Sequence, residues 1–204
     1  MQSSRPRRLL PFLVALLAAL LLGGCLRGEQ PFRLTDISGH MPDLDFQLVD
    51  DGGKAVRGAD YRGKVVLLFF GYTHCPDVCP LTLAELHQVL KQLGPEADRT
   101  RILFVSVDPT RDTPATMRQY VNAFDPRAVG LVGSERAVEA LSKRYRSAFS
   151  RSPGSAGDDY EVSHSSAVYV FDQAGRARVL VSPGTPREDL VHDLKLLLAA
   201  STPA

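Results

Sequence analysis

The sequence predicts a single α/β domain, and three observations lead to this fold class. Two continuous apolar runs, at 64–70 and 101–107, are typical of strands that are buried on both faces of a sheet. Apolar residues between 81 and 93 recur at helical spacing, so a helix is expected to separate the two strands. A composition that is 44% hydrophobic over 204 residues is enough to build one core of ordinary size.

Turn and cap signals predict the remaining elements. Two short strands at 46–49 and 55–56 flank a hairpin turn at 50–53. Thr113 and Pro114 suit the N-cap and the first residue of a helix that runs to about 124. The other expected elements are a strand at 128–132, a helix at 135–145, an exposed loop at 150–159, a hairpin of strands 167–171 and 178–181, and a closing helix at 186–200. This order predicts an α/β, thioredoxin-like fold with an added N-terminal β-hairpin.

The first 25 residues carry a secretory leader pattern. Three arginines precede an apolar stretch at 9–22, and its length of about 14 residues is short of the roughly 20 that a transmembrane helix needs. The sequence Leu-Gly-Gly-Cys at 22–25 resembles a bacterial lipobox, in which the cysteine becomes the lipidated first residue of the mature chain. A plain signal peptide or an uncleaved anchor is the alternative interpretation, and either would leave the domain outside the cytoplasm.

The expected organisation is therefore a lipoprotein signal peptide at 1–24, a lipidated tether at 25–40 and a thioredoxin-like domain at 41–204. Cys25 is the expected site of lipid attachment. The protein is expected to be exported and to face the periplasm or extracytoplasmic space, held to a membrane by its lipid.

Charge and cysteine count narrow the function. Lys and Arg number 24 against 23 Asp and Glu, so no excess positive charge attracts nucleic acid and no nucleic-acid partner is expected. Of the three cysteines, Cys25 is set aside for lipid, which leaves Cys75 and Cys79 in one short segment. A disulfide that closes so small a loop would constrain the unfolded chain only weakly, so structural stapling is a poor explanation for the pair.

The segment Cys75-Pro-Asp-Val-Cys79 places two thiols four residues apart where a strand enters a helix. If these residues are helical, both sulfurs project from one face about 6 Å apart. The N-terminus of a helix also favours the thiolate over the thiol. Thiolates select Cu(I) and zinc, and two sulfurs with one imidazole also suit Cu(II), so the segment predicts a metal site whose third ligand is a histidine.

Five histidines could supply that ligand: His40, His74, His87, His164 and His192. Position favours His164, because it lies where a loop enters the strand at 167–171, and in thioredoxin-like folds that loop faces the cysteine motif. His87 and His192 fall in helices, and His40 belongs to the tether. His74 is adjacent to Cys75, and neighbouring residues at a strand end point to opposite sides. Four other residues are explained as well by turns and packing and are not assigned to the site: Phe70, Tyr72, Asp77 and Asp108.

Four ordered motifs make the chain similar to the Sco (Sco/SenC) family of copper-assembly proteins. They lie at 70–80, 105–114, 124–133 and 162–166, within a likeness that extends from about 41 to 200. The resemblance implies a membrane-tethered protein that binds one copper, Cu(I) or Cu(II), through Cys75, Cys79 and His164. The family commonly has an acidic residue before this histidine, where the present chain has Ser163, so the groups that orient the ligand are expected to differ.

The implied function is that of a copper metallochaperone for the dinuclear copper centre of cytochrome c oxidase. The implied partners are the oxidase subunit that accepts copper and another copper chaperone as donor. The main alternative is a thiol-disulfide oxidoreductase that uses Cys75 and Cys79 without metal and keeps the oxidase cysteines, or another exported protein's thiols, reduced. Whether the chain is an enzyme stays open, since only this alternative assigns the pair a catalytic role.

The cysteine spacing, the residues around Cys75 and the number of ligands weigh against three alternatives to a copper site. Redox enzymes of this fold separate their cysteines by two residues, and here three intervene, which argues mildly against a redox role alone. A thiol peroxidase would need an arginine beside a single reactive thiolate, a pattern not found around Cys75. A structural zinc site would need a fourth ligand to complete its tetrahedron.

Overall fold

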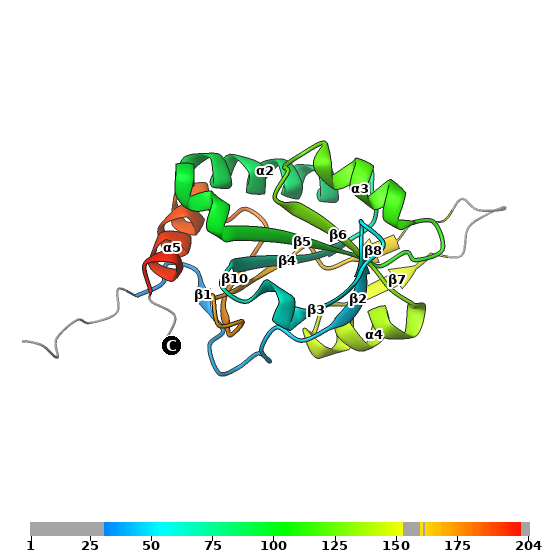
Figure 1. Ribbon diagram of the computed structural model, residues 1–204, viewed down its shortest axis with the longest axis horizontal. Helices are drawn as coiled ribbons and strands as arrows, with labels where there is room; N and C mark the ends of the chain where they lie inside the picture. Colours follow the sequence, from blue (N-terminus) through cyan, green and yellow to red (C-terminus); the bar gives the residue numbers. More distant parts are fainter. Residues whose placement is uncertain (1–30, 153–159, 161, 201–204) are drawn as a thin grey trace, which may run out of the picture. The chain divides into compact units, whose positions relative to one another are not determined.

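The computed structural model describes residues 31–152, 160 and 162–200 (Figure 1). From Phe32 onward these residues belong to one compact unit. Its main sheet has eight strands in the order β1-β10-β9-β4-β5-β6-β2-β3, and a second sheet pairs β7 with β8. The predicted signal peptide at 1–24 and Cys25 lie outside the described residues.

The strands are β1 (Thr35–Asp36), β2 (Gln47–Asp50), β3 (Ala55–Arg57), β4 (Val65–Gly71), β5 (Thr100–Ser106), β6 (Ala128–Val132), β7 (Phe149–Arg151), β8 (Val162–His164), β9 (Val168–Phe171) and β10 (Ala177–Val181). The helices in this part of the chain are α2 (Val78–Leu93), α3 (Pro114–Asn122), α4 (Glu135–Arg144) and α5 (Arg187–Ala199), with 3-10 turns η1 (Gly58–Tyr61) and η2 (Gly94–Arg99).

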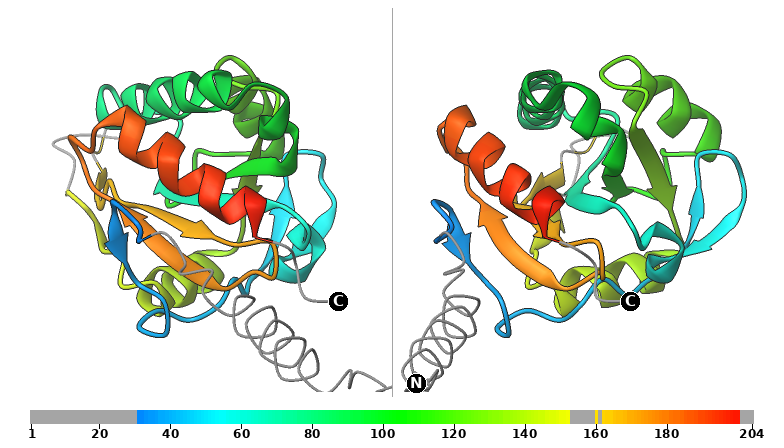
Figure 2. Two further views of the ribbon diagram at one scale, coloured as in Figure 1. Left: turned by 90° about the vertical axis from the view of Figure 1, so that its left-hand side faces the viewer. Right: turned by 60° about the vertical axis from the view of Figure 1, so that its left-hand side comes forward.

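Strand β4 lies at the centre of the main sheet and is buried along its whole length. It pairs in parallel with β5 and antiparallel with β9. Helices α2, α3 and α5 cover one face of the sheet and α4 covers the other (Figure 2). Successive side chains of β4 therefore enter different layers, with Phe69 packing on Phe104 and Phe70 packing on Tyr169. The predicted α/β, thioredoxin-like fold is confirmed, including the long apolar strands.

The predicted N-terminal hairpin and helices are also present. Strands β2 and β3 pair across the turn at 50–53, and β2 joins the main sheet through β6. The hydroxyl oxygen of Thr113 accepts a hydrogen bond from the backbone N–H of Thr116, 3.2 Å away, and so caps α3 as expected. Helix α2 begins at Val78, three residues before the predicted start, because Pro80 is tolerated in a first helical turn. Cys79 thus lies inside the helix.

The domain begins earlier than predicted, which corrects the boundary between a tether at 25–40 and a domain at 41–204. Strand β1 pairs with β10, and Ile37 is buried in the core. The backbone N–H groups of Arg33 and Leu34 donate to the carboxylate of Asp193 on α5, at 3.0 and 2.9 Å. A two-residue strand has no periodicity to detect, and its anchor is about 160 residues away in the chain, so the polar sequence at 32–40 suggested a linker.

The predicted loop at 150–159 is also partly wrong. Ser150 and Arg151 belong to β7, which pairs antiparallel with β8, so that Phe149 lies opposite His164. His164 therefore ends a short strand of its own and does not simply open the strand β9. Alternation over three residues in each strand is too brief a signal to identify such a hairpin from sequence.

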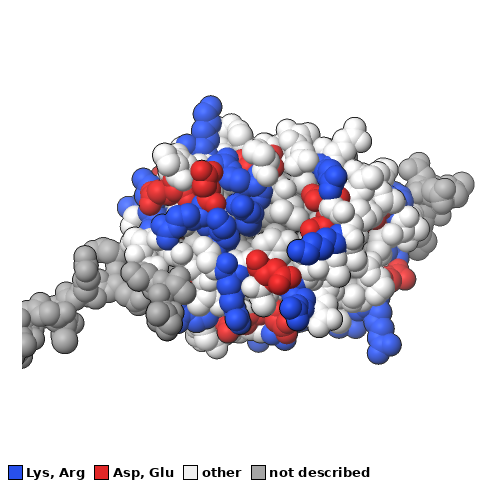
Figure 3. Space-filling model, viewed as in Figure 1, with Lys and Arg blue, Asp and Glu red and all other residues white. Residues whose placement is uncertain are grey.

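Charged residues of both signs lie interspersed on the face shown in Figure 3, with a concentration near α5. Ion pairs that tie α5 to other segments include Arg187 with Glu85 of α2 at 2.7 Å, and Asp189 with Arg33 at 3.2 Å. Among the described residues, none of the helices is both long enough and apolar enough to cross a membrane.

Candidate metal site

The two cysteines lie where β4 gives way to α2. Strand β4 ends at Gly71, Cys75 lies in the connecting turn and Cys79 is the second residue of α2. The backbone N–H of Cys79 points at the sulfur of Cys75, 3.4 Å away. Both cysteines are free thiols, with Cys75 9% exposed and Cys79 fully buried. The junction of strand and helix therefore holds two sulfurs side by side at the edge of the core.

The imidazole of His164 completes a three-donor cluster with these sulfurs. Its Nε2 lies 3.2 Å from Sγ of Cys79 and 3.8 Å from Sγ of Cys75. The three donor atoms lie within 4.8 Å of one another. Nδ1 lies 3.0 Å from the carbonyl oxygen of Ser165. Because a carbonyl only accepts, Nδ1 is the donor of this hydrogen bond, and in the neutral imidazole Nε2 is then the acceptor that faces the sulfurs.

The rings of Tyr72 and Phe69 pack against the imidazole of His164. The ring of Tyr72 meets it edge to face, with centroids 5.8 Å apart and planes at 90°, and Phe69 does so at 6.0 Å and 66°. The sequence drew attention to Phe70, which packs instead against Tyr145 and Tyr169 on the opposite face of the sheet. Period-two alternation along β4 could have identified Phe69, since it shares its face with Gly71, which lies next to Cys79.

Gly71 leaves the space that Cys79 occupies. A Cβ atom at Gly71 would lie 2.6 Å from Sγ of Cys79 and 2.5 Å from Cε2 of Phe104. Both distances are far shorter than van der Waals contact. The sulfur of Cys79 can therefore occupy this position only because residue 71 is a glycine.

Burial dominates the acidity of Cys79. It raises the pKa of the Cys79 thiol well above its usual value, against an opposing hydrogen bond from the backbone of Tyr72. The expectation that the helix N-terminus would favour a thiolate is thus wrong for Cys79, because desolvation outweighs the helix dipole. A metal ion that takes this sulfur must displace its proton.

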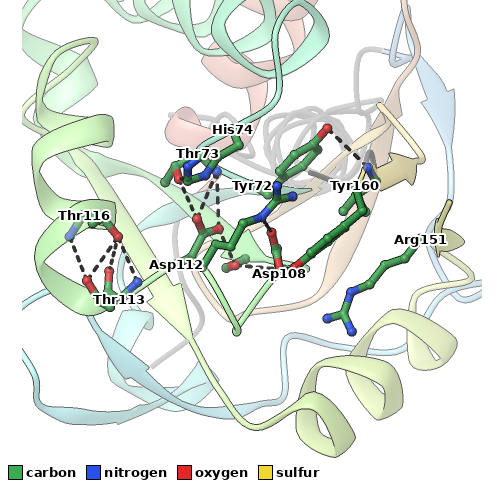
Figure 4. A network of polar contacts seen from close by, with 12 residues as sticks. Tyr72, Thr73, His74, Asp108, Asp112, Thr113, Thr116, Arg151 and Tyr160 are labelled. Carbon is green, nitrogen blue, oxygen red and sulfur yellow. Dashed lines mark hydrogen bonds and ion pairs between the residues drawn. The ribbon is translucent and has the colours of Figure 1, made fainter. Parts of the chain in front are cut away.

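A buried acid, Asp112, holds the turn that carries the cysteines (Figure 4). Its Oδ1 accepts from the hydroxyl of Thr73 at 2.5 Å, and its Oδ2 accepts from the hydroxyl of Ser106 at 2.5 Å. Burial raises the pKa of Asp112, opposed by these hydrogen bonds. No pattern in the sequence singles out Asp112, although it lies in the motif at 105–114.

The other four histidines lie apart from the sulfurs, each beside a local polar partner. The partners are Thr73 for His74, Asp125 for His87, Asp193 for His192 and the carbonyl of Ser38 for His40. Asp108 accepts hydrogen bonds from Arg111 and Tyr160, while Asp77 precedes α2 without a side-chain cap bond. The structure thus brings His164, and none of the other four, to the cysteine pair.

The donor set fits a soft or borderline metal ion. Two thiolates and one imidazole suit copper in either oxidation state, whereas oxygen donors, which hard cations require, are missing from the cluster as the described residues form it. Three ligands also leave a coordination position open.

Comparison with known proteins agrees with this geometry. A family model described as SCO1/SenC matches residues 31–199. The chain is 40% identical over 158 residues to the mitochondrial SCO2 homolog of Bos taurus, covering 76% of this chain and 59% of that one. The chain thus spans about three fifths of the length of this curated relative.

Two solved structures extend the comparison. The structure of Bradyrhizobium japonicum ScoI with copper bound is 41% identical, with a TM-score of 0.70, over 76% of this chain and 98% of that one. A SCO1/SenC family lipoprotein from Bacillus anthracis is 26% identical, with a TM-score of 0.70, over 82% of this chain and 99% of that one. On the family match and these relatives, the chain belongs to the SCO1/SenC family.

Proposed function

We propose that the chain is a copper metallochaperone that binds one copper ion through Cys75, Cys79 and His164. The main observation behind this proposal is that Nε2 of His164 lies close to Sγ of both cysteines. A relative of 41% identity whose structure has copper bound supports the choice of metal. We further propose that the copper is destined for the dinuclear copper centre of cytochrome c oxidase, with an oxidase subunit as acceptor and another copper chaperone as donor.

The described residues suit a carrier that releases its cargo. Binding removes the proton of the buried Cys79 thiol, and Nε2 of His164 already faces the sulfurs while Nδ1 lies at the carbonyl oxygen of Ser165. Tyr72 and Phe69 pack against the half-buried imidazole and limit its orientation. Because three donors leave one position free, a ligand from an acceptor can enter before a protein ligand leaves.

The same two thiols could serve a thiol-disulfide oxidoreductase. Both are reduced and lie within 4.8 Å of each other, close enough to be joined after a small movement. A redox role could use His164 as a base for one attacking thiol, but it does not require Nε2 to face both sulfurs. The metal-binding role explains all three residues.

Copper titration separates the two roles. The reduced domain is titrated with Cu(I) and with Cu(II), and the titrations are repeated with Cys75→Ser, with His164→Ala and with the double cysteine variant. We expect one tight site that is lost in the double variant, with Cu(II) more dependent on His164 than Cu(I). Copper binding no tighter than in the double variant, together with rapid reduction of a disulfide substrate, would establish the oxidoreductase role instead.

We also propose that residues 1–24 direct export and that Cys25 is lipidated, so that the domain faces the extracytoplasmic space. The leader pattern and the lipoprotein relative support this proposal. Mass spectrometry of the mature chain should find a lipidated Cys25 as its first residue, and Cys25→Ser should move the protein from the membrane fraction to the soluble fraction. An unmodified Cys25 in a membrane-bound wild-type chain would contradict lipidation.

A further inference from the structure

The imidazole of His164 is carried by a strand that does not belong to the main sheet. His164 ends β8, which pairs only with β7 in the described structure, while both cysteines follow from β4 of the main sheet. At the open end of the β7–β8 hairpin, the N–H of Ser165 donates to the carbonyl oxygen of Ala148 at 2.9 Å. The distance between imidazole and sulfurs therefore depends on what ties this hairpin to the body of the domain.

One contact with a buried carboxylate makes that tie, at the half-buried Tyr160, two residues before β8. The hydroxyl of Tyr160 donates to Oδ1 of Asp108 (Figure 4). Asp108 is fully buried just beyond the end of β5, and its own N–H donates to the hydroxyl of Ser106 at 3.0 Å. The anchor point thus lies directly after β5, a strand that is paired on both sides in the main sheet.

Arg111 links the same anchor to the imidazole. Its Nε donates to Oδ2 of Asp108, and its guanidinium lies 3.9 Å above the ring of Tyr160 and 5.7 Å from that of Tyr72. Tyr72 in turn meets the ring of His164, and its hydroxyl accepts from the N–H of Val162 at 3.4 Å. A continuous set of contacts therefore runs from Asp108 to both ends of β8.

An ion pair at the surface also connects the β7–β8 hairpin to the rest of the domain. Arg151 of β7 pairs with Glu135 of α4, whose side chain is 58% exposed. Exposed ion pairs of this kind contribute little, whereas a hydrogen bond to a buried carboxylate is costly to lose. Tyr160 therefore contributes more than Arg151 to holding the hairpin in place.

We propose that Tyr160 is a positioning residue for copper binding: its bond to Asp108 and its stacking under Arg111 latch the β7–β8 hairpin and so set how the imidazole of His164 meets the two sulfurs. This inference rests on the proposed function and identifies which residues outside the ligand set tune the site. Two thiolates alone suit Cu(I), whereas Cu(II) gains more from the imidazole. Loosening the latch should therefore weaken Cu(II) binding selectively.

The test compares Tyr160→Phe, which removes only the hydroxyl, with Tyr160→Ala, which also removes the ring under Arg111. Affinities for Cu(I) and Cu(II) are measured by competition, with His164→Ala as the lower limit. We expect Tyr160→Phe to lower Cu(II) affinity by about tenfold, the effect of one hydrogen bond to a charged group, with Cu(I) affinity changed less than about twofold. Tyr160→Ala should fall closer to His164→Ala.

Hydrogen exchange in the metal-free protein tests the latch without copper. The amide protons of Val162 and Ser165 should exchange at least about fivefold faster in Tyr160→Phe, while those of β4 and β5 stay protected. Tyr61→Phe is the matched control, because it removes the same atom from η1, where Tyr61 packs on Phe46. It should change neither copper affinity nor exchange at these two amides.

The outcomes separate this inference from the function on which it rests. Unchanged exchange at Val162 and Ser165 in Tyr160→Phe overturns the latch, as does an equal loss of Cu(I) and Cu(II) affinity. If the wild-type domain binds no copper, the metallochaperone proposal fails and the positioning role for copper fails with it. Faster exchange would then still identify a latch on the hairpin.

Discussion

At the scale of single residues, the metal site depends on neighbours that donate nothing to it. Tyr72 and Phe69 hold the imidazole, Asp112 holds the cysteine turn and Gly71 leaves room for the sulfur of Cys79. The cysteine pair could be predicted from the residues themselves, because two thiols four positions apart stand where a strand enters a helix, whereas His164 needed the family resemblance. Sequence alone could not predict Gly71 or Asp112, since a glycine and a short acid fit most loops and their role here depends on packing across strands.

The Gly71→Ala substitution tests the space beside Cys79. The new methyl group would overlap Sγ of Cys79 and the ring of Phe104, so we expect a loss of about 1–3 kcal/mol in the free energy of unfolding and weakened copper binding. Chemical denaturation and copper titration measure the two effects. Gly133→Ala is the control, because its methyl group would overlap Cδ2 of Leu48, which is not part of the copper site. Equal behaviour of the two variants would show that Gly71 has no special role.

Copper affinity should also depend on pH. Because burial raises the pKa of the Cys79 thiol, the metal-free protein carries this proton throughout the neutral range and must release it on binding. The apparent affinity should therefore rise by at least about tenfold per pH unit between about pH 6 and pH 8, one decade for each proton displaced. Titration against a competing ligand, corrected for that ligand's own protonation, measures the slope. A flat profile would mean that the sulfur is already ionised.

At the scale of elements, one buried carboxylate joins α2 to the segment between α3 and β6. Asp125 accepts two bonds from the guanidinium of Arg127, at 2.8 and 2.7 Å, and one from His87 of α2 at 2.9 Å. Its side chain is 1% exposed. Burial alone would raise the pKa of Asp125, but the hydrogen bonds from Arg127 and His87 lower it below the usual value.

The Asp125→Asn variant should show this stabilisation and its pH dependence. Since the folded-state pKa is depressed, the contribution is present above the unfolded-state pKa of about 3.9 and is lost as pH falls through the folded-state value. We expect a loss of about 1–3 kcal/mol in the free energy of unfolding at neutral pH. The difference from wild type should shrink in acid, as measured by denaturation from neutral pH to below the unfolded-state pKa. A difference that stays constant with pH would exclude the ionic origin.

Elements with a strong local signal were predictable and short paired ones were not. Residues close together in the chain are enough to reveal the apolar runs of β4 and β5, the apolar stripe of α2 and the Thr113 cap of α3. Strands β1, β7 and β8 have two or three residues each and exist because of partners distant in the chain. The error at 32–40 and the missed pairing of 149–151 with 162–164 have this common cause.

At the scale of the whole molecule, the order of elements was enough to predict the thioredoxin-like fold. The convergence of the site was not, because positions 75 and 164 are 89 residues apart and meet only when β8 folds over the end of β4. Only the family resemblance assigned His164 before the structure was known. Position in the chain favoured it without excluding the other four histidines.

X-ray absorption spectroscopy of the copper-loaded, reduced domain identifies the atoms that ligate copper. We expect one copper per chain, ligated by two sulfurs and one imidazole nitrogen, with the imidazole signal absent in His164→Ala and sulfur ligation reduced in Cys79→Ser. A copper ion without sulfur ligands, or an imidazole signal unchanged in His164→Ala, would contradict the proposed site.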